Sequence, residues 1–228
     1  MPAFEPRADE LPREFPVFPL AGALLLPHGK LPLNIFEPRY LAMTEDALGA
    51  GRMFGMIQPD PRLSDGPTGP GLYRIGCLGR LVSFSETDDG RYLITLLGLA
   101  RFAVAAELPM RRGYRRVQGD LSAFADDLEP TRDDQVRLDR PALLAALRGY
   151  FTRRGIDSNW DAINQMPDHT LVVTLSMVCP FDPAEKQALL EAATVAERAQ
   201  TLLALLQMET HAMPHAAPDR PAGRSRVS

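Results

Sequence analysis

Two histidines near the carboxyl end of the chain have a spacing that could bind a metal ion. His211 and His215, in "HAMPH", are four residues apart, which would place both rings on one face of a helix. Pro214 lies between them and would disrupt that helix, and no pair of carboxylates accompanies them. We therefore expect a solvated tail here, and no metal ion or other cofactor. The other two histidines, His28 and His169, stand alone and are expected in loops or at helix ends.

A basic segment, "RRGYRR", has a composition that can contact phosphate groups and stack on a base. Its residues are Arg111, Arg112, Tyr114, Arg115 and Arg116. The alternative is an exposed strand whose solvated arginines balance the acidic segment that follows, and charge runs usually mark such a face. We favour the exposed strand, so a nucleic acid partner is not expected, and RNA binding through 111–116 is kept as the alternative function.

An ATPase or a serine-lysine peptidase would need residues that this chain lacks. The one Gly-Lys pair, Gly29-Lys30, is followed by Leu31 instead of the serine or threonine of a phosphate-binding loop. No serine lies in a G-x-S-x-G pattern, and the only other lysine is Lys186. We therefore predict a protein without catalytic activity.

The overall composition is that of a globular protein with a sizeable core and little net charge. The 228 residues are 45% hydrophobic, and the formal net charge of -4 gives no reason to expect an acidic partner surface. Cys77 and Cys179 lie in unlike contexts far apart in the sequence, which favours buried thiols over a disulfide or a redox site. The first fifteen residues, with Asp9, Glu10 and Glu14, lack the apolar segment of a secretory signal, which predicts a cytoplasmic protein.

The elements that would position any site begin with an apolar segment, "FPVFPLAGALLLPHGKLPLNIFEPRY", at residues 15–40. Its prolines are Pro16, Pro19, Pro27, Pro32 and Pro38. A membrane-spanning helix needs about 20 unbroken apolar residues, and an internal proline costs a helix about 3 kcal/mol. We therefore predict short strands with prolines at their starts, edges and bulges, and no membrane span.

The rest of the first 125 or so residues is predicted to be mostly strand, with one inserted helix. Pro38 is placed like a first-turn helix proline, and Gly49 and Gly51 end that helix. A buried strand follows at 53–60, and Asp89-Gly90 between two apolar segments predicts a hairpin.

After the acidic segment 126–135 the pattern becomes helical. A helix is predicted from Pro141 to Gly155, and a short second helix covers "SNWDAINQM". The segment "DHTLVVTLSMV" is open between helix and strand because its β-branched residues lower helix propensity. Two further helices are predicted from the capping patterns at Asp182 and Thr194, before a loose tail.

The order of these pieces resembles the LON substrate-binding domain, which is the amino-terminal domain of Lon-type ATP-dependent proteases, and the stand-alone proteins that carry only this domain. The resemblance implies an α+β fold: an amino-terminal, six-stranded, PUA-like β pseudo-barrel with an inserted helix, followed by a carboxyl-terminal α-helical bundle. The predicted divisions are an extension at 1–14, the barrel at 15–128, the bundle at 129–210 and a tail at 211–228. The resemblance is carried by "FPLAGALLLPHGKLPLNIFEPRYLAM" at 18–43, "FGMIQPD" at 54–60, "LYRIGCLGRLVSF" at 72–84, "GRYLITLLGLARFAV" at 90–104, and "CPFDPAEKQALLEAATVAERAQTLLALLQ" at 179–207.

The same resemblance implies a polypeptide-binding function without catalysis. Lon proteases continue into an ATPase and a serine-lysine peptidase, and neither module is expected here. The implied partners are unfolded or tagged polypeptides, or a protease or chaperone that this protein would serve as an adaptor or sensor, and no oligomeric state is indicated. The candidate contact residues are Phe36, Arg39, Tyr40 and Arg74.

Two further expectations concern the helix start and the space beside it. Phe36, Tyr40 and Leu41 are predicted to pack tightly against the barrel, while Glu37 and Arg39 cap and brace the inserted helix. A third function, binding or catalysis on a small molecule in a cleft between barrel and bundle, has no residue constellation in its favour. A deep pocket lined by converging ionisable groups would indicate such a role.

Overall fold

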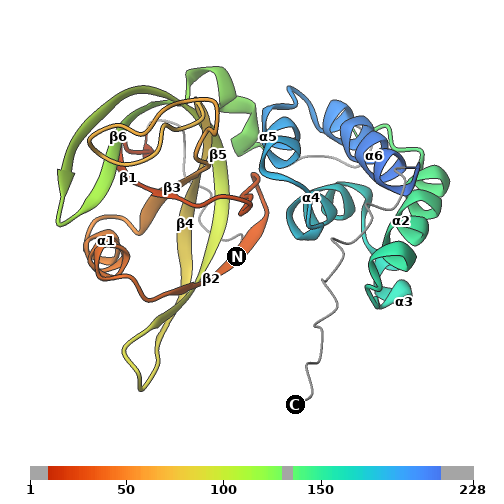
Figure 1. Ribbon diagram of the computed structural model, residues 1–228, viewed down its shortest axis with the longest axis horizontal. Helices are drawn as coiled ribbons and strands as arrows, with labels where there is room; N and C mark the ends of the chain where they lie inside the picture. The colour runs from red at the N-terminus through yellow and green to blue at the C-terminus, as the bar shows by residue number, and fades with distance from the viewer. Residues whose placement is uncertain (1–9, 130–135, 212–228) are drawn as a thin grey trace, which may run out of the picture.

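The computed structural model describes residues 10–129 and 136–211 of the chain. Its amino-terminal part is a β barrel with one inserted helix, and its carboxyl-terminal part consists of helices (Figure 1). The protein therefore has the predicted α+β architecture. His211, predicted to begin the tail, is instead the last residue of a helix. The rest of the predicted tail, 212–228 with His215, lies outside the described residues, as do the first nine residues of the predicted extension.

Six strands form one sheet, and five of them close into a ring. β1 pairs with β3 in parallel and with β6 in antiparallel orientation, while β4 joins β3 to β5, and β5 pairs back onto β6. β2 pairs with β5 alone among the described strands and forms the edge of the sheet. The predicted six-stranded pseudo-barrel is confirmed. The strands are β1 (Glu14–Pro19), β2 (Lys30–Ile35), β3 (Met53–Ile57), β4 (Ile75–Glu86), β5 (Tyr92–Arg111) and β6 (Tyr114–Asp120).

Two phenylalanines fill the centre of this small barrel. Phe15 of β1 and Phe102 of β5 pack edge to face, with ring centroids 4.9 Å apart, and both are almost fully buried. Strand glycines leave room for them: a Cβ on Gly76 would lie 2.5 Å from the Phe102 ring, and a Cβ on Gly119 would lie 2.4 Å from the Phe15 ring. Small barrels combine large and small interior residues in this way because their strands curve around a narrow core.

Three of the five prolines in the apolar amino-terminal segment lie at positions that tolerate a missing N–H group, while Pro16 and Pro19 lie in β1, which is paired on both sides. Pro32 lies in the edge strand β2, Pro27 lies in the loop before it, and Pro38 begins helix α1 (Pro38–Gly49). A sheet edge and a first helical turn already leave N–H groups without intrachain partners, so proline costs little there. The predicted short strands and inserted helix are confirmed. Across residues 10–129 and 136–211, every helix is too short or too polar to cross a bilayer.

The residues around the start of α1 divide between core and surface. Tyr40 is buried and stacks on Phe18, with ring centroids 4.1 Å apart, and Leu41 packs partly buried against the same core. Phe36 is 61% exposed, so its predicted packing against the barrel is wrong. β2 ends at Ile35, the last residue of that strand to reach the core, and the Phe36 ring instead lies under the Arg91 guanidinium at 5.8 Å.

Glu37 and Arg39 pair with each other and leave the start of α1 uncapped by a side chain. Arg39 Nη2 donates to Glu37 Oε2 at 2.8 Å, and the Glu37 side chain makes no capping hydrogen bond to the helix. The predicted capping role is therefore wrong. The two residues were also predicted to brace the helix, and the contact between them is an exposed ion pair, which contributes little to stability.

Helices make up the carboxyl-terminal part of the chain. The segment 168–178 is helical, because burial of Leu171 and Val172 in the core outweighs the small cost of valine in a helix. Helix α5 begins at the predicted capping box of Asp182 and Glu185. The helices are the 3-10 helix η2 (Ser122–Leu128), α2 (Arg140–Arg154), α3 (Trp160–Gln165), α4 (Asp168–Val178), α5 (Pro183–Glu191) and α6 (Val195–His211).

The barrel and the helices share one hydrophobic core. A continuous cluster of buried side chains extends from Tyr40 and Leu96 in the barrel to Leu147 in α2 and Leu202 in α6. The two parts of the chain therefore bury each other's apolar surface, and their packing fixes the relative position of barrel and bundle.

Helix α5 is also joined to the barrel by two buried glutamines. Gln58, just after β3, donates to the Pro183 carbonyl at 3.0 Å, and Gln187 of α5 donates to the Ile75 carbonyl at 3.1 Å. Both glutamine side chains are buried, so loss of either partner would leave an unsatisfied polar group.

Candidate functional site

Four large apolar side chains are exposed around the outer part of the β4–β5 hairpin. The two strands continue past the barrel as an arm, which extends below the barrel in Figure 1. The exposed fractions are 61% for Phe36, 46% for Val82, 41% for Phe84 and 45% for Leu93. We call these four residues the apolar arm.

Both faces of the outer β4–β5 hairpin carry apolar side chains. Phe84 of β4 lies opposite Ile94 and packs edge-on against Tyr92, with ring centroids 4.9 Å apart. Leu93 projects from the other face, because successive residues of a strand point to opposite sides. Neither face is fully covered at this distance from the barrel, so the arm presents apolar surface to a partner.

A hollow of about 420 Å³ lies along the arm between β2, β4 and β5. Its floor combines the apolar side chain of Leu93 with the hydroxyl groups of Ser83 and Ser85 and the amide of Asn34. Such a surface can contact an apolar side chain and hydrogen-bond a peptide group at the same time. The lining residues are Pro32, Leu33, Asn34, Ser83, Ser85, Leu93, Ile94 and Thr95.

The four contact residues predicted from sequence do not form one site. Phe36 belongs to the apolar arm, and Arg39 lies near it, with its guanidinium 4.6 Å above the Tyr40 ring. Tyr40 itself is only 6% exposed and offers little surface to a ligand. Arg74 immediately precedes β4, and the arm lies at the other end of that twelve-residue strand. The structure therefore places Phe36 and Arg39 in one region and Arg74 in another.

Three residues of the apolar arm were not singled out from the sequence. Val82, Phe84 and Leu93 flank the Asp89-Gly90 turn and look like ordinary core positions of a hairpin. The sequence carries one indication, the length of the segments 72–84 and 90–104 on either side of the turn, and in the structure β4 has 12 residues and β5 has 20, which is longer than most strands.

The basic segment 111–116 is occupied by contacts within the protein. Tyr114 is buried, and its hydroxyl donates to Asp46 Oδ2 at 2.6 Å. The arginines pair with acidic residues of α1, β5 and β1, so the expected balance with the acidic segment downstream is wrong. RNA binding through this segment gains no support from this arrangement. The ion pairs join Arg111 to Asp46, Arg112 to Glu45 and Asp46, Arg115 to Glu107, and Arg116 to Glu14.

The contacts of this segment also set two pKa values. The Tyr114 hydrogen bond, with help from Arg112 and Arg111, holds the pKa of Asp46 below its usual value. Burial, together with the same hydrogen bond, raises the pKa of Tyr114 to about 12. The segment therefore fastens α1 to the β5–β6 hairpin through a carboxylate that stays ionised at neutral pH.

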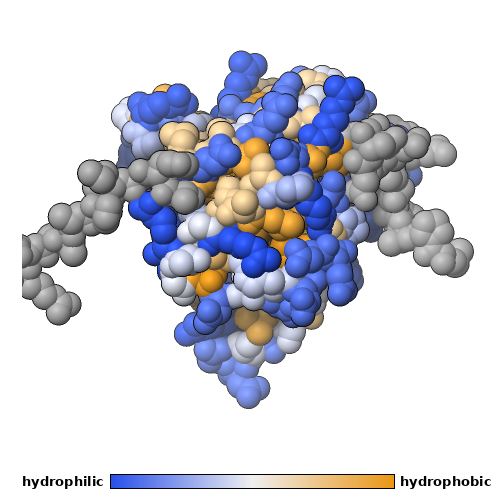
Figure 2. Space-filling view, turned by 90° about the vertical axis from the view of Figure 1, so that its right-hand side faces the viewer, coloured by the Kyte–Doolittle hydropathy of each residue, from blue (hydrophilic) through white to orange (hydrophobic). Residues whose placement is uncertain are grey.

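The helical side of the molecule carries a second group of apolar side chains. Figure 2 shows this side, where apolar surface gathers in the middle and hydrophilic side chains surround it. Val178 at the end of α4 is 63% exposed, and Met208 near the end of α6 is 65% exposed.

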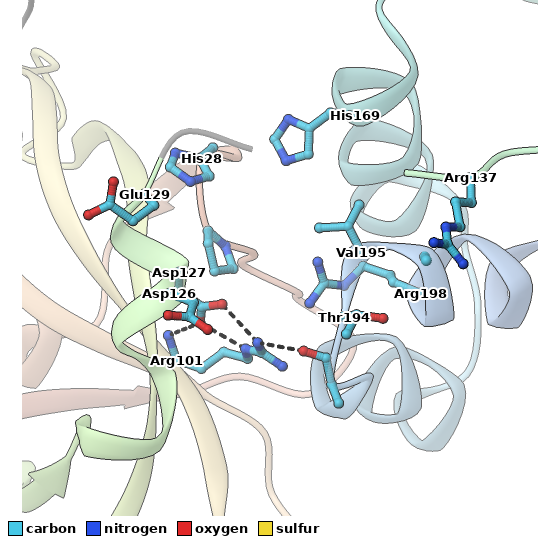
Figure 3. A pocket seen from close by; sticks show the side chains of 13 residues that line it. His28, Arg101, Asp126, Asp127, Glu129, Arg137, His169, Thr194, Val195 and Arg198 are labelled. Carbon is cyan, nitrogen blue, oxygen red and sulfur yellow. Dashed lines mark hydrogen bonds and ion pairs between the residues drawn. The ribbon is translucent and has the colours of Figure 1, made fainter. Parts of the chain in front are cut away.

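A cavity of about 760 Å³ lies where the barrel meets the helices. His28, Arg101 and Asp127 line it from the barrel side, and His169 and Arg198 line it from α4 and α6 (Figure 3). Ionisable groups therefore converge in a pocket between barrel and bundle. Such a pocket is the feature that would indicate a small-molecule site there. The sequence did not reveal it because Arg101 and Arg198 come from distant elements.

The fold and these surfaces define a class of protein: α+β molecules in which a small closed barrel with an apolar arm is joined to a helical bundle. The family model described as "ATP-dependent protease La (LON) substrate-binding domain" matches residues 14–208. The chain belongs to this family.

Similar proteins of known sequence are Lon proteases. The chain is 25% identical over 202 residues to Lon protease of Escherichia coli strain K12, which covers 86% of this chain and 25% of the relative. It is 32% identical over 126 residues to Lon protease 2 of Sorangium cellulosum, which covers 54% of this chain and 15% of the relative. The chain thus spans a quarter or less of the length of these two relatives.

Solved structures with a similar fold are amino-terminal domains of the same family. The Lon N-terminal domain protein from Xanthomonas campestris has a TM-score of 0.55 and 25% identity, with 84% of this chain and 97% of that chain covered. The N-terminal domain of Mycobacterium avium complex Lon protease has a TM-score of 0.60 and 18% identity, with 85% of this chain and 97% of that chain covered. The observed fold is therefore that of a Lon amino-terminal domain.

Proposed function

We propose that this protein is a polypeptide-binding module without catalytic activity of its own, which recognises unfolded or tagged chains as a substrate-recognition or adaptor protein. The observation that carries the proposal is the apolar arm, which exposes four large apolar side chains on a member of a substrate-binding domain family. Exposed apolar surface of this kind is a common feature of protein interaction sites.

Side-chain contact is a better mode of binding here than addition of a strand to the sheet. β2 is the edge strand, and Pro32 in its middle cannot donate a hydrogen bond to an added strand. Lys30 at the start of β2 is exposed and adds a charge to the same edge, which further opposes strand pairing. A bound polypeptide would instead place apolar side chains against Phe84 or Leu93 and peptide groups near the hydroxyls of the adjacent hollow.

The test is binding of a permanently unfolded model protein, reduced and carboxymethylated α-lactalbumin, measured by fluorescence anisotropy. We expect the double variant Phe84→Ser/Leu93→Ser to weaken binding by about tenfold, since two exposed apolar contacts of about 1 kcal/mol or less each are lost. Both positions are on the surface of the arm, so the barrel should remain folded, which circular dichroism checks.

The matched control is Met208→Ser, which removes an even more exposed apolar side chain from the helical side. We expect this variant to bind like the unchanged protein. Absence of binding at high micromolar concentration, or equal weakening by both variants, would contradict the proposal. An adaptor role adds a requirement for a second partner, which crosslinking in cells followed by identification of bound proteins would test.

A further inference from the structure

The cavity between barrel and bundle differs from the apolar arm in being lined by charged groups. Its two buried arginines, Arg101 and Arg198, have different partners. Arg101 is fully engaged. Its Nε and Nη2 donate to the two carboxylate oxygens of Asp127, each at 2.8 Å. Its remaining N–H groups face the carbonyls that follow α5, with Nη1 at 2.7 Å from Ala192 O and Nη2 at 3.3 Å from Ala193 O. Arg101 thus joins the barrel to the helices and has no donor left for a ligand.

Arg198 is only 3% exposed, and only part of its guanidinium group is hydrogen-bonded. Its Nε donates to the Leu189 carbonyl at 2.8 Å, which fixes the side chain against the end of α5. This is the only side-chain hydrogen bond of Arg198 to a described residue, which leaves its two terminal nitrogens facing the cavity. Figure 3 shows the guanidinium turned towards the barrel wall of the cavity. A buried cation with free donors is costly unless a negative group reaches it.

The charges near Arg198 leave a local excess of positive charge. Burial, with a smaller contribution from the nearby Arg101 guanidinium, lowers the pKa of Arg198 to about 10. Asp127 is the carboxylate that offsets them, and it is already paired with Arg101. The innermost part of the cavity therefore holds two guanidinium groups and one carboxylate.

The first turn of α6 adds to this electrostatic preference. Thr194, Val195 and Ala196 line the cavity at the amino-terminal end of this seventeen-residue helix. The amino-terminal end of a helix dipole carries partial positive charge, which favours an anion. Thr194 Oγ1 accepts from the Glu197 N–H at 3.1 Å, and the Glu197 carboxylate accepts from the Ala193 N–H at 3.0 Å, so the N–H groups of Val195 and Ala196 are the ones left for an anion. Arg198 lies on the same turn, so both features act on one part of the cavity.

The outer lining limits how much negative charge a ligand can bring. Asp126 and Glu129 are exposed on the barrel side, and Arg137 is on the helical side. Among the lining residues that the structure describes, the three arginines and three acidic residues balance. One negative group at Arg198 is therefore favourable, whereas a polyanion would meet the acidic side chains of the rim.

We propose that this cavity binds a carboxylate-bearing ligand with no further net negative charge, its carboxylate lying between the free nitrogens of Arg198 and the first turn of α6. Its volume of about 760 Å³ is that of a site for a small organic molecule or for the last residues of a chain. Either a free acylated amino acid or the carboxyl end of a polypeptide supplies this chemistry. The site is separate from the apolar arm, so it does not depend on the proposed function.

The test uses matched acids and amides as probes in heteronuclear NMR titrations of the full chain. One pair is N-acetylalanine and N-acetylalaninamide, and the other is N-acetyl-tetraalanine with a free or an amidated carboxyl end. We expect an acid to shift resonances of α6 and of the His28 loop with a Kd of about 1 mM or below, and its amide to shift neither. Binding of the small acid alone identifies a metabolite-like ligand, and binding of the peptide acid alone identifies a chain end.

Three variants separate binding from folding. Arg198→Gln is expected to weaken acid binding by about tenfold or more, because a charge-assisted hydrogen-bonded contact is lost. Ala196→Phe should block the cavity while Arg198 keeps its bond to Leu189, so it tests the site even if Arg198→Gln fails to fold. Arg52→Gln removes an exposed positive charge on the barrel and should leave binding unchanged.

Four outcomes would overturn the inference. Amides that bind as well as acids would remove the role of the carboxylate. Acid binding that survives both Arg198→Gln and Ala196→Phe would place the site elsewhere. Tighter binding of citrate or inorganic phosphate than of either acid would contradict the limit on charge, and no shifts at ~20 mM of either acid would leave the cavity without this function.

Discussion

Asp46 joins the inserted helix to the β5–β6 hairpin through bonds to Tyr114 and Arg112. The Tyr114 hydroxyl donates to one carboxylate oxygen at 2.6 Å, and Arg112 Nη1 donates to the other at 2.9 Å. Because Tyr114 is buried, loss of the charged acceptor leaves its hydroxyl with a weaker partner. These contacts of the basic segment 111–116 thus fix α1 to the barrel.

The variant Asp46→Asn should lower the free energy of unfolding by about 1–2 kcal/mol at pH 7. The folded-state pKa of Asp46 lies below the ordinary value of 3.8, so its contribution is fully present above that value. The contribution is lost as the pH falls from 3.8 through the lower, folded-state pKa. Urea unfolding at pH 7 and at decreasing pH below 4 should therefore show the two proteins converging in stability.

Asp88→Asn is the control, because Asp88 is an exposed residue of the hairpin turn. It should change stability little at either pH. A constant gap between Asp46→Asn and the unchanged protein across this pH range would show that the carboxylate charge is not the source of the effect.

β5 is the element that connects the closed barrel, the edge strand β2 and the apolar arm. Gly98, in the middle of β5, marks the closest approach of this strand to the segment before β2. A Cβ at this position would lie 2.0 Å from the Leu26 carbonyl oxygen and 2.7 Å from its carbonyl carbon. Because the obstacle is backbone, it cannot move aside as a flexible side chain would.

Gly98→Ala should therefore destabilise the protein by about 3 kcal/mol or more, as expected when a backbone contact has to shift. Gly49→Ala is the matched control: Gly49 ends α1, has open space around its Cβ position, and should gain about 0.5–1 kcal/mol. Thermal unfolding of both variants measures the difference between their melting temperatures. Similar melting temperatures for the two would show that β5 and the preceding segment can separate at little cost.

The strands and helices were largely predictable because their determinants are local. Proline positions, the Asp89-Gly90 turn and the capping box at Asp182 each act within a few residues of the chain. The helix at 168–178 is not predictable from local sequence, because its state depends on burial against other helices, which the valines alone do not indicate.

The candidate sites were less predictable because they depend on where elements end and meet. Phe36 was expected in the core, but its position one residue beyond β2 places it on the surface. Arg101 and Arg198 meet only when the helices pack on the barrel, so no motif or spacing relates them in the sequence. Sequence patterns thus indicated which segments fold, and tertiary packing decided which side chains remain available to a ligand.

At the scale of the whole molecule, the shared core and the contacts of Arg101 make barrel and bundle one cooperative unit. Arg101 extends from β5 to Asp127 and to the carbonyls after α5, so separation of the helices would leave a buried guanidinium unpaired. The apolar arm and the charged cavity are therefore held on a common frame, although each has its own proposed ligand.

This cooperativity predicts a single unfolding transition reported equally by two residues far apart. Trp160, the one tryptophan of the chain, packs in the helical part, whereas Cys77 is a free, fully buried thiol in β4 of the barrel. Burial also raises the pKa of the Cys77 thiol, so it should react with iodoacetamide only after the barrel opens. Tryptophan fluorescence and labelling of Cys77, located by mass spectrometry, should therefore give the same urea midpoint. If the fluorescence changed at lower urea while Cys77 stayed protected, the helices would unfold first, and the cavity between them and the barrel could not be a fixed binding site.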